Sequence, residues 1–166
     1  LTSSALLTAC GGERTPPASN ASAFTPDDAQ LLEEIADTIL PTTPASPGAR
    51  TAAVAPILAL LVNDCYDEGA QRRIRDGLAA LRALCDHRCG GPFTKLSPAE
   101  RERLLGEVDA EAVTQGEAHW FHLARELSLR AYFSSEIGMT RALRYVRVPG
   151  RWTGCVPLEP GQPAWV

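Results

Sequence analysis

Helical periodicity with capping signals is the feature that most constrains how this chain folds. In the stretch "FTPDDAQLLEEIADTIL", residues 24–40, Thr25 is a favourable N-cap, Pro26 suits the first helical position and two aspartates occupy the first turn. The apolar residues of this stretch share one helical face: Leu31, Leu32, Ile35, Ile39 and Leu40. Pro41 ends the pattern, so the sequence predicts an amphipathic helix here.

Further helical patterns fill the middle of the chain, at residues 49–66, 67–88, 90–109 and 116–138. The first of them is apolar nearly all round, which predicts burial, and Pro56 either kinks it or marks its true start. Ser97, Pro98 and Glu100 form a capping box. No strand pair with a hairpin turn and no internal repeat stands out. We therefore expect an all-α fold, a four- to five-helix bundle over residues 24–144, with an extended N-terminal tether and a long irregular C-terminal tail.

Charge is unevenly distributed along the 166 residues, whose net charge is −4. Residues 125–166 hold six arginines and three acidic residues, so this end is basic while the rest is acidic. The excess is too small for a nucleic-acid-binding domain, which needs clustered basic residues. Two interpretations stay open: a solvated face, or an arginine-lined contact with an acidic or polar partner surface.

The motif "LLTACGG" near the start is typical of a bacterial lipobox, in which an apolar residue and two small residues precede a cysteine that becomes lipidated. Residues 1–10 are thus predicted to be the end of an export signal with Cys10 as the lipidated residue, and residues 11–23 a flexible linker. The alternative is an incidental cysteine in a short apolar stretch. Apart from a lipid anchor or a bound complex, no link to a membrane is expected, because no apolar run of about 18 residues occurs. We expect a periplasmic protein, or one associated with the periplasmic side of a membrane.

The segment "CDHRC" places Cys85 and Cys89 four residues apart, with His87 between them. A metal site would need a further spaced pair of ligands, and the spacing is not that of covalent haem attachment. A Cys85–Cys89 disulfide in an oxidising compartment is the favoured interpretation, with free thiols as the alternative and metal binding as a weaker one.

Catalytic equipment is not evident in the sequence. His119 and His122 lie three residues apart on a predicted helix, but no carboxylate cluster accompanies them. The acidic residues of segment 24–40 fit a solvated helix face. No phosphate-binding, nucleophile-elbow or zinc-protease motif is present. We expect no catalytic, cofactor-binding or metal-binding residue in this chain; an enzyme that uses the two histidines and a metal is a remote alternative.

The C-terminal segment "YVRVPGRWTGCVPLEPGQPAWV", residues 145–166, has no helical or strand period and contains four prolines, three glycines and two tryptophans. Such a segment cannot form its own core and needs a surface on which to lie. That surface is either a partner protein, with the tail extended over it, or the chain's own helical bundle.

Several stretches resemble the gluconate 2-dehydrogenase subunit 3 family: "FTPDDAQLLEEIADTILP", "PFTKLSPAERERLLGEVD", "YFSSEIG", "ALRYVRVPGRWTGC" and "PGQPAW". The resemblance covers roughly residues 23–166. It implies a non-catalytic small subunit of a bacterial sugar or polyol dehydrogenase. The implied partners are a large glucose–methanol–choline-type subunit that binds FAD and, in some complexes, a cytochrome subunit with haem c. The small subunit would support maturation of the large one and carry the twin-arginine export signal for both.

With that resemblance, the tail and the segment before it are predicted to form the partner interface. Trp152 and Trp165 would be aromatic anchors, and Arg147 and Arg151 polar contacts. The full predicted interface is Tyr132, Phe133, Glu136, Arg144, Tyr145, Arg147, Pro149, Arg151, Trp152, Cys155 and Trp165. The alternative is a stand-alone periplasmic lipoprotein that serves as a structural or binding module.

Overall fold

The computed structural model describes residues 24–148, 150 and 153–165, and it is all-α, as the sequence predicts. The α-helices are α1 (Pro26–Ile39), α2 (Val54–Cys65), α3 (Glu68–Cys89), α4 (Pro98–Gln115) and α5 (Trp120–Phe133). Short helical turns η1 (Phe93–Lys95) and η2 (Gly116–Ala118) precede α4 and α5, and a π-helical segment η3 (Gly138–Ala142) follows α5. No β-strand occurs within the described ranges, and none of their helices is long and apolar enough to cross a membrane.

The predicted caps set the starts of two helices. Thr25 accepts a hydrogen bond from the backbone of Asp28, whose carboxylate accepts one from the backbone N–H of Thr25 in return. Ser97 and Glu100 form the same reciprocal pair at the start of α4. Each box satisfies amide donors that the first helical turn leaves open. Both capping predictions are therefore confirmed.

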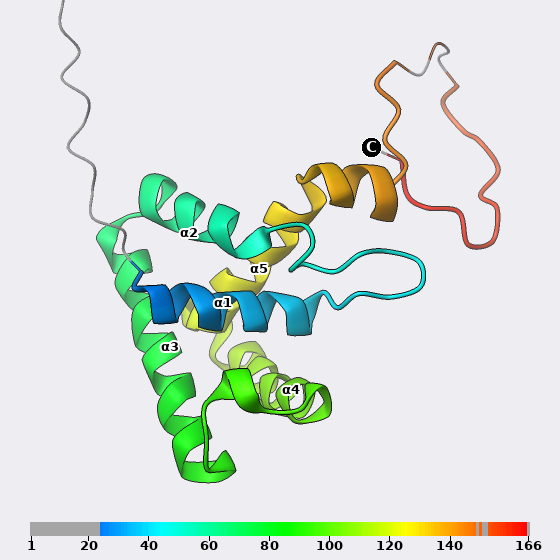
Figure 1. The fold of residues 1–166 in the computed structure, drawn as a ribbon. Helices are drawn as coiled ribbons and strands as arrows, with labels where there is room; N and C mark the ends of the chain where they lie inside the picture. The colour runs from blue at the N-terminus through cyan, green and yellow to red at the C-terminus, as the bar shows by residue number, and fades with distance from the viewer. Residues whose placement is uncertain (1–23, 149, 151–152, 166) are drawn as a thin grey trace, which may run out of the picture.

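Helix α5 packs against each of the other four α-helices, and it runs through the middle of the bundle in Figure 1. The main core has contributions from every helix, and its fully buried side chains include Leu32, Ile35, Leu58, Ile74, Leu78, Leu104 and Leu127. A second, smaller core cluster lies at the C-terminal end of α5. It consists of Ala36, Ala49, Ala52, Val54, Ala131 and Tyr132, with Ile137 and Ala142 packed against it.

Three sequence expectations are corrected by the structure. Helix α2 begins at Val54, because residues 49–53 form turns, so Pro56 marks the start of the helix rather than a kink. Its missing N–H costs nothing there, since the first four amides of a helix have no intrahelical partner. Full burial of α2 is wrong: Leu60 is 60 % exposed. The last predicted helix also ends early, at Phe133, and a turn separates it from η3.

The two cysteines of "CDHRC" lie in the last turns of α3 as free thiols. Cys85 is buried in the main core, and Cys89 is half-buried. Burial, with the nearby Cys89 and Asp86, raises the pKa of the Cys85 thiol to about 11, against a hydrogen bond from the backbone of Phe93. The structure therefore does not contain the favoured disulfide, which stays a prediction for the oxidised protein. Cys10 lies outside the described residues.

Candidate partner-binding surface

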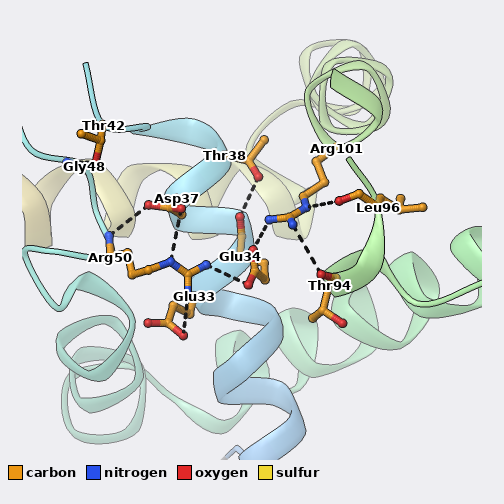
Figure 2. Close-up of polar contacts among 10 residues, drawn as sticks. All are labelled: Glu33, Glu34, Asp37, Thr38, Thr42, Gly48, Arg50, Thr94, Leu96 and Arg101. Carbon is orange, nitrogen blue, oxygen red and sulfur yellow. Dashed lines mark hydrogen bonds and ion pairs between the residues drawn. The ribbon is translucent and has the colours of Figure 1, made fainter. Parts of the chain in front are cut away.

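An ion network centred on the buried Glu34 links α1 to the loop after it and to α4 (Figure 2). Glu34 on α1 is only 8 % exposed, and its carboxylate accepts from two arginines. Arg50 Nη2 lies 2.8 Å from Glu34 Oε1, and Arg101 Nη1 bonds the other oxygen. Arg101 also donates to the carbonyl oxygens of Thr94 and Leu96, at 3.4 Å and 2.9 Å. Both oxygens of the buried carboxylate are thus paired, as a buried charge requires.

Arg50 fixes the loop 40–53, which connects α1 to α2. Its guanidinium lies 3.2 Å from Glu33 and 3.4 Å from Asp37, in addition to its bond to Glu34. The hydrogen bond to Glu34 is the largest of the effects that raise the pKa of the Arg50 guanidinium above its usual range. Inside the loop, the backbone N–H of Gly48 donates to the Thr42 hydroxyl at 2.9 Å. These contacts tie the loop to α1 although it has no regular structure.

Tyr132, in the last turn of α5, joins that loop to the C-terminal part of the chain. Its hydroxyl donates to the carbonyl of Pro47 at 2.6 Å and lies 2.6 Å from Ser46 Oγ. The side chain is 3 % exposed. The structure thus corrects the prediction that Tyr132 contacts a partner: its ring belongs to the second core cluster, and its hydroxyl is already bonded within the chain.

The turn after α5 determines where the tail begins. The Ser135 hydroxyl donates to the carbonyl of Tyr132 at 2.7 Å and accepts from the N–H of Gly138 at 3.0 Å. Gly138 is buried, and a Cβ built on it would lie 1.9 Å from the carbonyl oxygen of Tyr132. Only glycine allows this close approach. Through it, η3 and the start of the tail have a fixed position on the bundle.

The described part of the tail forms a loop that closes on itself and projects from the helices (Figure 1). The backbone N–H of Arg144 donates to the carbonyl of Ala164 at 2.8 Å, and Arg144 and Trp165 form an isolated parallel β-bridge. The guanidinium carbon of Arg144 lies 3.9 Å from the centre of the Trp165 ring, a cation–π contact. We call this pair the latch. The tail loop is the described part of residues 145–165, namely residues 145–148, 150 and 153–165.

Large apolar side chains are exposed on the tail loop. Val148 and Leu158 are 75 % and 81 % exposed, and Tyr145, Val156 and Trp165 are each about half exposed. Single exposed apolar residues are ordinary on protein surfaces, but their concentration on one projecting loop is typical of an interaction site. The loop does not fold back over the helices, so the interpretation that the tail covers its own bundle does not match its described residues.

Exposed arginines accompany these apolar residues. Arg141 in η3 and Arg147 in the tail loop are exposed, and neither forms an ion pair with any residue that the structure describes. By contrast, Arg125 pairs with Asp109, and Arg130 lies 3.0 Å from Glu126. This end of the molecule therefore presents two exposed arginines without an ion-pair partner among the described residues, besides its apolar side chains.

Other predicted interface residues also lie at this end. Phe133 is 39 % exposed, Glu136 is exposed, and Cys155 is an exposed free thiol. Pro149, Arg151 and Trp152 lie outside the described residues. The interface predicted from the sequence did not include Arg141, Val148, Val156 and Leu158. The three aliphatic residues follow no helical or strand periodicity that would have marked them, whereas the two tryptophans stand out because tryptophan is rare.

In the motif "HWFH", His119 has a structural role at the start of α5. His119 is the N-cap of α5, and its Nδ1 accepts from the backbone N–H of Phe121 at 3.3 Å. In the ranges that the structure describes, no three side chains of the metal-binding types come together. A cleft of about 720 Å³ between α3 and α4 is lined by His119 and Trp120 together with charged residues of both signs.

The fold is all-α, and exposed apolar side chains gather at one end of it. These features define a helical protein with a candidate protein-binding surface. Residues 26–150 match the family Gluconate 2-dehydrogenase subunit 3, and the chain belongs to that family. No curated protein and no solved structure matches the chain. Membership identifies it as a subunit of a dehydrogenase complex.

Proposed function

We propose that this chain is the non-catalytic small subunit of a periplasmic FAD-dependent sugar dehydrogenase complex, and that it binds the large flavoprotein subunit. The observation that supports this most is the tail loop, which exposes Tyr145, Val148, Val156, Leu158 and Trp165 together. Association with another protein would remove this apolar surface from water. The exposed Arg141 and Arg147 would meet acidic groups of the partner.

In this proposal the chemistry belongs to the partner, a glucose–methanol–choline-type subunit that holds FAD. A cytochrome subunit with haem c is a further proposed partner that would accept electrons. The small subunit would support folding and flavin loading of the large one and accompany it through twin-arginine export, with lipidation at Cys10 as an anchor. The maturation and export roles are what the resemblance to this family implies, and lipidation at Cys10 is proposed from the motif "LLTACGG".

A pull-down of the tagged chain from its native host tests the proposal. The expected product contains a second, heavier band on a denaturing gel and has the absorption spectrum of oxidised flavin; haem bands would add the cytochrome. The matched control is a chain that lacks residues 145–166. It should fold, because its core clusters lie within residues 24–142, and lose most of the flavoprotein. A colourless single-band product from the full chain would instead support the stand-alone lipoprotein.

Maturation is tested separately by expressing the large subunit with and without this chain. We expect the flavin content and the exported fraction of the large subunit to fall when the small subunit is absent. Unchanged flavin content and export would limit the role of this chain to assembly.

A further inference from the structure

We infer that the tail loop binds its partner in the closed form, and that the latch between Arg144 and Trp165 is a positioning device which keeps it closed. The inference rests on the proposed function, because it concerns how the same surface meets the flavoprotein. It changes the expected binding mode from an extended tail lying over the partner to a preformed loop inserted into it.

Closure depends on few interactions. They are the 2.8 Å hydrogen bond from Arg144 to Ala164, the β-bridge and the cation–π contact. Inside the loop, the N–H of Gln162 bonds the carbonyl of Glu159 at 3.0 Å, a local turn. None of the large core residues is part of the latch. Because an exposed cation–π contact and one hydrogen bond are each weak, a closed and an open form should both be populated in the free chain.

The base of the loop is held far more firmly than the loop itself. The N–H of Tyr145 donates to the carbonyl of Met139 at 3.2 Å, and η3 is placed by the close contact of Gly138 with Tyr132. Tyr132 is in turn bonded to Pro47 in the loop that Arg50 fixes. Arg144 is thus held against the helical bundle, and closure brings Trp165, at the other end of the tail, back beside it.

The closed form presents apolar side chains along the loop and arginines near its base. Val148, Val156 and Leu158 are exposed along the loop, while Arg141 and Arg147 near its base have no acidic neighbour that pairs with them among the described residues. A fitting occupant is a protein surface with an apolar depression bordered by carboxylates. We assign this surface to the large flavoprotein subunit. If only the closed form binds, the apparent affinity is the intrinsic affinity multiplied by the closed fraction.

A reversible covalent latch tests this. Paired β-strands lie about 4.8 Å apart, within the Cα separation that a disulfide spans, so Arg144→Cys with Trp165→Cys can form a bridge. Cys65→Ser and Cys155→Ser remove the exposed thiols of the described residues from the background. The probe is the flavoprotein that co-purifies with the wild-type chain, separated from it and titrated with the variant in its oxidised and reduced states.

The double variant lacks both latch side chains in either state, so the comparison isolates closure from direct side-chain contact. We expect the oxidised form to bind about three- to tenfold more tightly than the reduced form. Equal affinities would overturn the inference, since Arg144 and Trp165 would then act only as direct contacts. Weaker binding by the oxidised form would overturn it in the other direction, because the tail would have to open. If the wild-type chain itself does not bind the flavoprotein, the proposed function fails first, and the inference with it.

A graded series without new cysteines is a second check that the latch must pass. Trp165→Phe keeps a weaker aromatic face for Arg144, and Trp165→Ala removes it. We expect affinity to fall in that order, to about two- to fivefold below wild type for Trp165→Ala. An unchanged affinity in both variants would contradict the latch.

Discussion

The hydroxyl of Tyr132 bonds the carbonyl of Pro47 at 2.6 Å across 85 residues of sequence. This contact joins the end of α5 to the loop between α1 and α2, and Arg50 joins the same loop to the buried Glu34. A continuous set of polar contacts therefore runs from the first helix of the bundle to the base of the tail loop. The position of the candidate interface depends on residues that do not lie on it.

Tyr132→Phe should lower the free energy of unfolding by about 1–2 kcal/mol, because it removes the hydroxyl that bonds Pro47 and Ser46. Urea denaturation of both proteins measures the difference. Tyr145→Phe is the matched control: Tyr145 is exposed on the tail loop, so the same deletion should change stability by less than about 0.5 kcal/mol. Equal losses in the two variants would contradict the assigned role of Tyr132.

Gly138→Ala should destabilise the chain by about 1–3 kcal/mol, since the new Cβ meets the carbonyl oxygen of Tyr132 and η3 must shift. Binding of the flavoprotein should weaken as well. The control is Gly106→Ala in the exposed face of α4, where a Cβ meets nothing within 4 Å. There, higher helix propensity should add about 0.5–1 kcal/mol to the stability. Thermal unfolding that moves in the same direction for both variants would refute the packing argument.

Arg101→Ala should cost about 2–3 kcal/mol of unfolding free energy, because one oxygen of the buried Glu34 carboxylate loses its cationic partner while Arg50 still pairs with the other. Arg103 lies two residues away on the same helix, and its pair with Glu107 is largely exposed. Arg103→Ala should therefore cost no more than about 0.5 kcal/mol. Chemical denaturation at neutral pH and two salt concentrations compares them; a cost for Arg101→Ala that disappears in high salt would show that the network is not buried.

Acid should destabilise the protein partly through Asp28. Burial opposes ionisation of this carboxyl, but hydrogen bonds from Thr25 and Arg82 and the charge of Arg82 outweigh it, so its pKa lies below the ordinary value of 3.8. A depressed folded-state pKa gives stability that is fully present above pH 3.8 and is lost as the pH falls through the folded-state value. Asp28→Asn should thus be less stable than wild type near pH 7, and the gap should narrow below about pH 4. Unfolding curves between pH 7 and pH 2.5 measure it, and a constant gap would be inconsistent with this linkage.

The thiols should separate into two classes on reaction with a thiol reagent at pH 8. Cys65 and Cys155 are exposed and should react rapidly. Cys85 should react only on unfolding, because it is buried and, with a pKa of about 11, only about one molecule in a thousand is a thiolate. Peptide mapping by mass spectrometry assigns the sites. Protein prepared under oxidising conditions that shows no reaction at Cys85 or Cys89 even when unfolded would instead contain the predicted disulfide.

Local signals explain why much of the fold could be predicted from the sequence. Thr25 and Ser97 each act within one helical turn, so their capping boxes are visible in a few adjacent letters. The closure of the tail is different, because Arg144 and Trp165 are far apart in the sequence and no periodicity relates them. Trp165 was predicted to be an aromatic anchor, but no sequence pattern predicted its contact with Arg144.

The burial of α2 could not be predicted, because an evenly apolar composition does not show which side of a helix faces the core. The helix is apolar on nearly every side, yet only one side meets α1 and α5, and Leu60 on another side stays exposed. Tyr132 shows the same limit in reverse. The family resemblance placed Tyr132 in the predicted interface, whereas its hydroxyl bonds Pro47, in a loop that Arg50 ties to α1.

Closure of the tail loop has a practical consequence for fusion proteins. Trp165 lies beside Arg144 at the base of the loop, so a bulky group fused directly after Trp165 would begin at the proposed docking face. A purification handle or fluorescent reporter placed there would compete with the flavoprotein for the same space.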